Sequence, residues 1–111
     1  MRGSCHCGKV GIAVAQAPEW LGSCNCSVCV RLASLMAYYH PDDVVISPAG
    51  ETDPYVWGDK CIAIHHCRTC GCFTHWEGLI PDLDRMGVNA RMLDDLDLGS
   101  IEIRKIDGAS Y

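Results

Sequence analysis

The cysteines of this chain gather in three tight groups, and this grouping limits the possible fold more than any other feature of the sequence. The groups are Cys24, Cys26 and Cys29; Cys5 and Cys7; and Cys67 and Cys70. Together they hold seven of the nine cysteines. Thiols at C-x-C and C-x-x-C spacing rarely bridge one another comfortably, but they suit one metal ion, which needs several sulfurs about 2.3 Å from a single point. The spacing therefore predicts metal sites instead of disulfide bonds.

The length of 111 residues predicts one domain over residues 1–111. A chain of this size buries only about two-thirds of its unfolded surface, so a structural metal would add stability that the core alone does not supply. No apolar leader precedes Cys5, and no apolar run approaches the roughly 20 residues of a membrane span. We therefore expect a cytoplasmic protein without a membrane partner, in which clustered cysteines indicate metal binding or catalysis.

Two other classes of protein are disfavoured. A secreted disulfide framework conflicts with the odd number of cysteines and with the C-x-C spacing. The formal net charge is −5, and seven thiolates with two zinc ions would make it more negative by three. An acidic surface repels phosphate groups, so we expect no nucleic-acid partner.

Short apolar stretches predict an all-β fold, because turn signals recur about every 8–12 residues. We expect strands at residues 10–14, 35–40, 44–46, 55–57, 62–66, 73–77, 86–92 and 101–103. We expect a ligand-carrying turn at residues 3–9 and one short helical turn at residues 27–33. In the strand at 86–92 the apolar residues share one face, and the other face carries a polar stripe of Arg85, Asn89 and Arg91.

Two of the cysteine groups supply four thiolates, which saturate a tetrahedral zinc ion and leave no open position. These thiolates are Cys5, Cys7, Cys67 and Cys70. We predict a structural zinc there, which joins the N-terminal turn to a second turn far along the chain.

The third group, Cys24, Cys26 and Cys29, supplies only three thiolates. Three protein ligands plus water are typical of a catalytic zinc, whose open position can polarise a carbonyl group or hold a thiolate or hydroxide. The alternative is a closed site with a fourth protein ligand. The candidates for that ligand are Cys61, Cys72, His65, His66 and His75. Adjacent strand residues point to opposite faces, so at most one of the two neighbouring histidines belongs to a cleft.

Few cationic side chains are available to hold an anionic substrate. Arg31 lies two residues after Cys29, and the polar stripe offers Asn89 and Arg91. Because arginine binds carboxylates through two hydrogen bonds, Arg31, Asn89 and Arg91 are the candidate substrate-binding residues. The alternative for the stripe is a solvated face.

Three segments carry a family resemblance in their order and spacing. They are Gly3-Ser4-Cys5-His6-Cys7-Gly8-Lys9-Val10, Cys24-Asn25-Cys26-Ser27-Val28-Cys29 and Cys67-Arg68-Thr69-Cys70-Gly71. They resemble the glutathione-dependent formaldehyde-activating enzyme family, which includes centromere protein V, and residues 88–93 are similar to the centromere-protein-V-like branch. The resemblance implies a β-tent fold of small antiparallel sheets with two zinc ions per chain, one structural and one catalytic, in the cysteine groups described above.

The resemblance also implies addition of glutathione to formaldehyde to give S-hydroxymethylglutathione. We therefore expect a zinc-dependent carbon–sulfur lyase that acts on a small thiol–aldehyde adduct, with a small thiol or aldehyde, glutathione included, as its partner. The alternative is a non-catalytic, zinc-stabilised module that binds another protein. Glutathione is a net anion and the protein is acidic, so we expect weak glutathione affinity unless Arg31 or the polar stripe lines the triple-cysteine site. The oligomeric state is left open.

Overall fold

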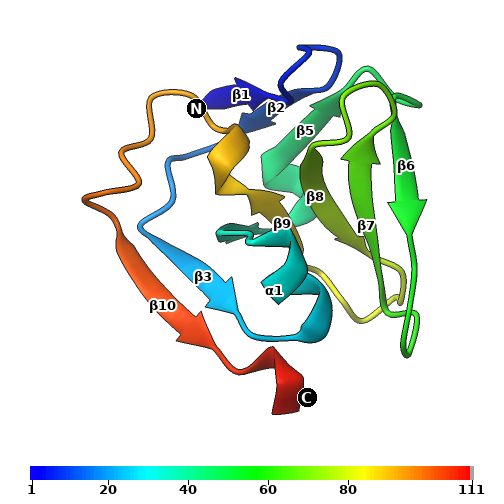
Figure 1. The fold of residues 1–111 in the computed structure, drawn as a ribbon. Coiled ribbons are helices and arrows are strands. Elements are labelled where there is room, and N and C mark those ends of the chain that lie inside the picture. Colours follow the sequence, from blue (N-terminus) through cyan, green and yellow to red (C-terminus); the bar gives the residue numbers. More distant parts are fainter. Residues whose placement is uncertain (111) are drawn as a thin grey trace.

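The computed structural model describes residues 1–110, which form two β-sheets and one short α-helix (Figure 1). This architecture confirms the all-β class expected from the sequence. The smaller sheet has three antiparallel strands in the order β1-β2-β5. Its strands are β1 (Arg2–Ser4), β2 (Gly11–Val14) and β5 (Val44–Ser47).

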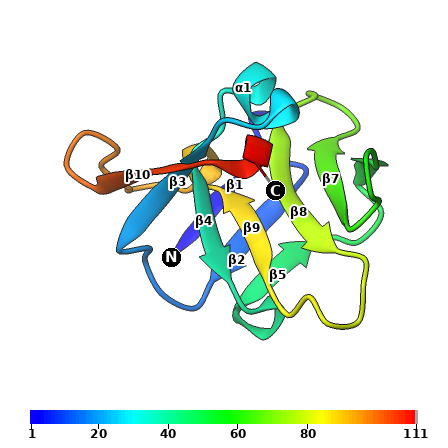
Figure 2. The same cartoon turned by 90° about the horizontal axis from the view of Figure 1, so that it is seen from below.

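The larger sheet has seven strands in the order β10-β3-β4-β9-β8-β7-β6. Its strands are β3 (Trp20–Cys24), β4 (Met36–Tyr39), β6 (Thr52–Tyr55), β7 (Ile62–Cys67), β8 (Phe73–Gly78), β9 (Met86–Asn89) and β10 (Glu102–Ile106). Strand β10 runs parallel to β3, and the other neighbouring pairs are antiparallel. Figure 2 shows β4, β9 and β8 fanned out side by side in the middle of this sheet.

The main core lies between the two sheets. Ile12 and Val14 alternate with smaller residues in β2, so both point to the same face and are buried. They belong to one apolar cluster with Leu21 of β3 and Val88 of β9, which are both 0% exposed. This packing holds β3 and β9 in place, and these strands position the functional groups described below.

Helix α1 (Ser27–Leu32) begins directly after Cys26 and confirms the expected helical turn. It ends at Ala33, whose φ of 52° lies in the left-handed region. The Nε atom of Arg91 donates a hydrogen bond to the carbonyl oxygen of Ala33 at 3.3 Å, which anchors this end to the chain beyond β9. No helix within residues 1–110 combines the length and the apolar character needed to cross a membrane.

Several strand boundaries differ from the expectation. The strand expected at 55–57 lies upstream as β6, because the chain turns at Trp57, whose carbonyl oxygen accepts the N–H of Lys60 at 3.1 Å. Strand β1 occupies the start of the turn expected at 3–9. Strand β3 was not expected at all, since Gly22 and Ser23 are weak strand formers. It forms because it pairs with β10 on one side and β4 on the other.

The strand expected at residues 86–92 ends at Asn89. The Asn89 side chain accepts a hydrogen bond from the N–H of Arg91 at 3.3 Å, and this contact starts a 3-10 helix at Ala90–Met92. The change of backbone breaks the strand alternation. Arg85, Asn89 and Arg91 therefore do not form a stripe on one strand face, and that part of the sequence interpretation is wrong.

Candidate metal centres and the adjoining cleft

Four thiols from two turns far apart in the sequence converge on one point. Cys5 and Cys7 lie between β1 and β2, Cys67 ends β7, and Cys70 lies in the turn before β8. All four sulfur atoms lie within 4.8 Å of one another. The Cys7 Sγ is 3.6 Å from the Sγ atoms of both Cys5 and Cys67. Four sulfurs about 2.3 Å from a tetrahedral zinc stand about 3.8 Å apart, so this arrangement fits a metal ion.

Backbone N–H groups favour the thiolate form in this four-cysteine group. Burial opposes ionisation of Cys5, but the N–H of Val10, which donates to the Cys5 Sγ at 3.3 Å, and the neighbouring thiols outweigh it and lower the pKa of Cys5. The N–H groups of Cys72 and Cys7 lower the pKa of Cys70 to about 5. Thiolates are the form that binds metal, so part of the site is prepared for a cation before one enters.

Three further thiols meet where β3 passes into α1. Cys24 ends β3, Cys26 directly precedes α1, and Cys29 lies in the first turn of the helix. Their sulfur atoms lie within 4.8 Å of one another, and no fourth His, Cys, Asp or Glu of residues 1–110 joins them. The side chains considered as a fourth ligand thus lie outside this group: Cys61, Cys72, His65, His66 and His75. Such a set can hold a metal ion with one position left for a non-protein ligand.

In the three-cysteine group the pKa values of Cys26 and Cys29 shift in opposite directions. Burial raises the pKa of Cys29 to about 12, and the adjacent thiol of Cys26 adds to this shift. Burial also opposes ionisation of Cys26, but the backbone N–H and the thiol of Cys29 outweigh it and lower the pKa of Cys26. A divalent cation bound here would displace the proton of Cys29, because metal binding requires the thiolate.

An apolar cleft of about 420 Å³ opens beside the three thiols, which form part of its wall. Aromatic and branched side chains make up much of the rest. They include Trp20, Tyr38, Trp57, Ile64, Phe73 and Trp76. The Tyr38 ring is central, with its centroid 5.6 Å from that of Trp20 and 6.4 Å from that of Trp76. Small-molecule sites typically enclose about 300–1,000 Å³ and are mostly apolar, so the cleft has the size and lining of such a site.

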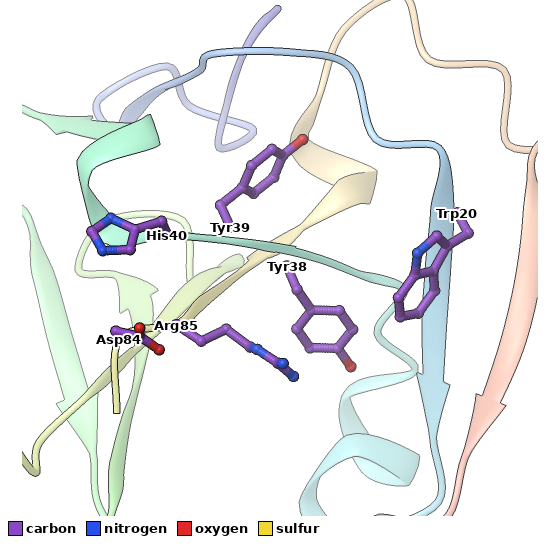
Figure 3. Close-up of a pocket in the computed structure, with 6 residues that line it drawn as sticks. All are labelled: Trp20, Tyr38, Tyr39, His40, Asp84 and Arg85. Atoms are coloured by element: carbon purple, nitrogen blue, oxygen red, sulfur yellow. The ribbon is translucent and has the colours of Figure 1, made fainter. Parts of the chain in front are cut away.

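Arg85 brings the only full positive charge that the described residues place in the wall of this cleft. Its guanidinium carbon lies 5.8 Å from the centroid of the Tyr38 ring. Figure 3 draws a second hollow, which Arg85, Tyr38 and Trp20 also line, and it shows the Arg85 side chain extending toward Tyr38, with Trp20 on the opposite side of that ring. The ion pairs among residues 1–110 do not include Arg85, although Asp84 precedes it in the sequence. Its charge therefore remains available at the cleft.

The C-terminal segment closes one side of the three-cysteine group. The Asn25 Nδ2 donates to the Asp107 Oδ1 at 2.9 Å, and the Asn25 Oδ1 accepts the N–H of Ala109 at 2.9 Å. These bonds hold Gly108 against the Cys24 Sγ, where a Cβ atom would collide with the sulfur. Gly108 also lines the cleft. Sequence reasoning missed this contact, because no local pattern joins residues more than eighty positions apart.

The three candidate substrate-binding residues are not among those that line the cleft. Arg31 folds back along α1, where a terminal nitrogen donates to the carbonyl oxygen of Ser27 at 2.9 Å. Asn89 is 5% exposed, and its Nδ2 donates to the carbonyl oxygen of Phe73 at 2.9 Å. Arg91 holds the backbone after α1, as described above. All three bind main-chain oxygens, and their contact with a substrate stays a prediction.

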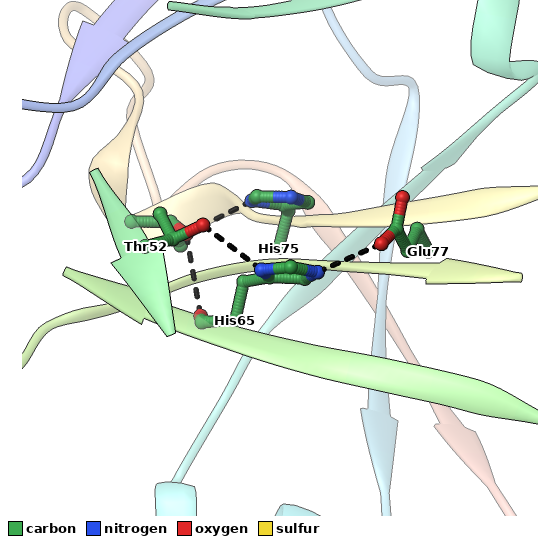
Figure 4. A network of polar contacts seen from close by, with 5 residues as sticks. Thr52, His65, His75 and Glu77 are labelled. Atoms are coloured by element: carbon green, nitrogen blue, oxygen red, sulfur yellow. Dashed lines mark hydrogen bonds and ion pairs between the residues drawn. The ribbon is translucent and has the colours of Figure 1, made fainter. Parts of the chain in front are cut away.

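Two of the histidines stack on each other across β7 and β8, away from both cysteine groups (Figure 4). The ring centroids of His65 and His75 are 4.6 Å apart, with an interplanar angle of 4°. The His65 Nδ1 lies 2.9 Å from the Thr52 Oγ1, and its Nε2 lies 2.9 Å from the Glu77 Oε1. Burial, and then the charge of His65, lower the pKa of His75 to about 4. The pair belongs to a polar network of side chains from β6, β7 and β8.

Comparison with known proteins identifies a matching family and a solved structure of similar fold. A family model described as "Glutathione-dependent formaldehyde-activating enzyme" matches residues 1–104. The chain is also similar to a Rhodobacter sphaeroides protein of known crystal structure, with a TM-score of 0.79 and 29% sequence identity, over 94% of this chain and 100% of that chain. No curated protein matches this chain. The match at residues 1–104 includes both cysteine groups.

Proposed function

The chain belongs to the glutathione-dependent formaldehyde-activating enzyme family, and on that premise we propose that it is a zinc-dependent carbon–sulfur lyase-type enzyme acting on a small thiol–aldehyde adduct. A thiol R–SH and an aldehyde R′–CHO give the adduct R–S–CH(OH)–R′, and the reaction runs in both directions. During addition a sulfur electron pair forms the C–S bond, the carbonyl π electrons move to oxygen, and the thiol proton ends on that oxygen. S-hydroxymethylglutathione is one such adduct.

The observation that carries this proposal is the position of the three-cysteine group in the wall of the cleft. Cys24, Cys26 and Cys29 leave one position of a tetrahedral ion without a ligand from residues 1–110, and the space beside them is large enough for a small molecule. A closed group away from any cavity would support a structural role alone.

We assign a structural zinc to the four-cysteine group and a second zinc to the three-cysteine group. When bound at the second group, zinc supplies positive charge that lowers the pKa of a thiol or polarises a carbonyl group. The thiolates also need the cation for their own stability, since three sulfurs in close contact repel one another once ionised.

The chain's own side chains contribute orientation, exclusion of water and a proton. The aromatic wall around Tyr38 covers an enclosed reactant and removes water from around it. Burial, and then the charges of Cys24 and Cys29, raise the pKa of Tyr38 to about 12. The Tyr38 hydroxyl therefore keeps its proton at neutral pH and can donate a hydrogen bond to the oxygen that changes between carbonyl and hydroxyl. Gly22 leaves room for this hydroxyl, because a Cβ there would lie 2.6 Å from it.

The second candidate function is a zinc-stabilised module that binds another protein. Exposed aromatic residues favour it, since Tyr55 is 54% and Trp57 38% exposed. These side chains border a hollow that Arg31 and other residues of α1 also line. A binding module has no need for an incompletely ligated cysteine group inside a cleft, however, so we rank the enzymatic function first.

The test measures exchange between free aldehyde and adduct by NMR, with ¹³C-formaldehyde, zinc-loaded protein and each of three thiols: glutathione, 2-mercaptoethanol and 2-mercapto-3-phenylpropionate. The proposal expects the wild-type protein to accelerate exchange and Cys26→Ala to lose at least about tenfold of that acceleration. Cys61→Ala is the matched control, because this cysteine lies outside both groups. No acceleration with any of the three thiols, or an equal loss in both variants, would contradict the proposed activity.

A further inference from the structure

We propose that the cleft selects an adduct with an aromatic or similarly apolar body and a single carboxylate, that Arg85 binds this carboxylate, and that glutathione is a poor occupant. The inference rests on the proposed function, because it names the substrate class of the same site. This substrate class follows from a comparison of the charged and apolar groups of a ligand with the side chains that line the cleft.

The walls of the cleft favour a flat apolar body. Trp57, from the turn after β6, lines the same space as Phe73 and Trp76 of β8. Ile62 and Ile64 of β7 add branched apolar surface to the wall. Aromatic rings bind one another through stacked or edge-to-face contacts, so a ring-sized ligand gains contacts from several walls at once.

Among the described residues that line the cleft, Arg85 carries the only full positive charge. Arg85 directly precedes β9, and its side chain extends over the ring of Tyr38. The described residues provide it with no carboxylate partner, so its hydrogen-bond donors are open to a ligand. Arginine presents two parallel N–H groups that match a carboxylate, and apolar surroundings strengthen the bond.

Tyr38 connects this charge to the three-cysteine group. The Arg85 guanidinium lies over the Tyr38 ring, whereas the Tyr38 hydroxyl lies beside Gly22, two residues before Cys24. Arg85, Tyr38 and the three cysteines all lie in the wall of the same cleft. We expect the ligand to lie along Tyr38 with its carboxylate at Arg85, its reacting carbon at the sulfurs and its apolar body between them.

Glutathione matches this site poorly. It carries two carboxylates, one ammonium group and two amides, and the cleft offers one cation and no carboxylate among the described residues that line it. Its ammonium group and second carboxylate would be left unpaired against apolar walls, and such burial opposes binding. Arg31, which sequence reasoning considered for this task, is bonded to the Ser27 carbonyl oxygen outside the cleft.

The experiment compares four probes on zinc-loaded protein by NMR titration: 3-phenylpropionate, 3-phenylpropanol, propionate and glutathione. The first carries both the ring and the carboxylate, and the next two each lack one of them. We expect 3-phenylpropionate to bind at least about tenfold more tightly than each of the others, because only it uses both Arg85 and the aromatic walls.

Two variants locate the carboxylate. Arg85→Gln should reduce the affinity for 3-phenylpropionate at least about tenfold, to that of 3-phenylpropanol, because it removes the charged bidentate donor. Arg2→Gln, the matched control at an exposed arginine of β1 outside the cleft, should leave the affinity unchanged. Arg31→Gln tests the other candidate arginine, and we expect it to leave the affinity unchanged as well. Unchanged binding in Arg85→Gln, tighter binding of glutathione, or a loss in Arg31→Gln alone would overturn the inference. Binding that survives Arg85→Gln but disappears when zinc is removed would place the carboxylate at the metal and would also overturn it.

The same samples are used for the aldehyde-exchange measurement, so the two proposals fail in different ways. Absence of accelerated exchange with every thiol tests the proposed function. The ratios of the probe affinities test the ligand class alone, because they require no turnover.

Discussion

Gly108 lies directly against Cys24, with its backbone in contact distance of the Cys24 Sγ and no room for a Cβ atom between them. The contact joins the C-terminal segment to the three-cysteine group, and hydrogen bonds from Asn25 to Asp107 and Ala109 hold it there. The C-terminal segment thus covers part of the group, and all three cysteines also lie in the wall of the cleft.

Gly108→Ala should therefore weaken metal binding at the three-cysteine group by about tenfold, since either the sulfur or the C-terminal segment must move. The measurement is zinc release to a chromogenic chelator, which resolves the weaker site from the stronger. Gly99→Ala is the control, because its Cβ would meet only the Asp97 Oδ1, at 3.3 Å, far from the cysteine groups in the sequence. Identical release curves for Gly108→Ala and wild type would show that the contact does not shape the site.

The two cysteine groups should respond differently to mutation. Cys67 is 1% exposed and links two distant turns, so Cys67→Ala should lower Tm by at least about 10 °C, because the metal's binding energy is part of the folding energy. Cys26→Ala should lower Tm by less than about 5 °C while removing aldehyde exchange. Thermal melts of zinc-loaded protein measure both. Equal losses of Tm would show that the division into structural and reactive groups is wrong.

Tyr38→Phe should lower kcat for adduct formation by about 10- to 100-fold and leave KM nearly unchanged, because it removes one proton donor but keeps the ring. Tyr39→Phe is the matched control. Its hydroxyl donates to the Gln16 carbonyl oxygen at 2.9 Å, and it does not line the cleft. Equal rates in Tyr38→Phe and wild type would remove the hydroxyl from the mechanism.

His75 predicts an acid-sensitive contribution to stability. Its pKa is about 4 in the folded chain and 6.5 as a free side chain, so the unfolded state binds the extra proton first. The stabilisation is fully present above about pH 6.5 and is lost as the pH falls toward 4, by up to about 3 kcal/mol.

His75→Phe isolates this contribution, because acid weakens the cysteine groups equally in both proteins. Urea unfolding at several values between pH 7 and pH 5 should show the free energy of unfolding falling more steeply in the wild type than in the variant. Parallel dependence on pH would contradict the lowered pKa of His75.

The local parts of the site were predictable from the sequence. The spacing of Cys24, Cys26 and Cys29 determines that three sulfurs can meet within six residues, and the structure brings them together. The Cys5/Cys7 pair and the Cys67/Cys70 pair also come together as expected. A closed tetrahedral metal site needs four sulfurs, and each pair supplies only two.

The cleft was not predictable, because it depends on strand pairing between distant segments. Strand β3 has a weak local signal and exists through its neighbours. Arg85 was grouped with Arg91 on one strand face, but the cap at Asn89 ends the strand between them and sends the two side chains to different places. Trp57 was expected inside a strand, and it instead lies in the turn that follows β6, beside the cleft.

The most direct test of the central claim is a crystal structure of the zinc-loaded protein with anomalous data at the zinc edge. The account predicts two zinc ions per chain, one bound by Cys5, Cys7, Cys67 and Cys70. It predicts the other at Cys24, Cys26 and Cys29, with a solvent molecule or small ligand in the fourth position, facing Tyr38. A fourth protein ligand on the second ion, or a disulfide in place of either zinc, would contradict it.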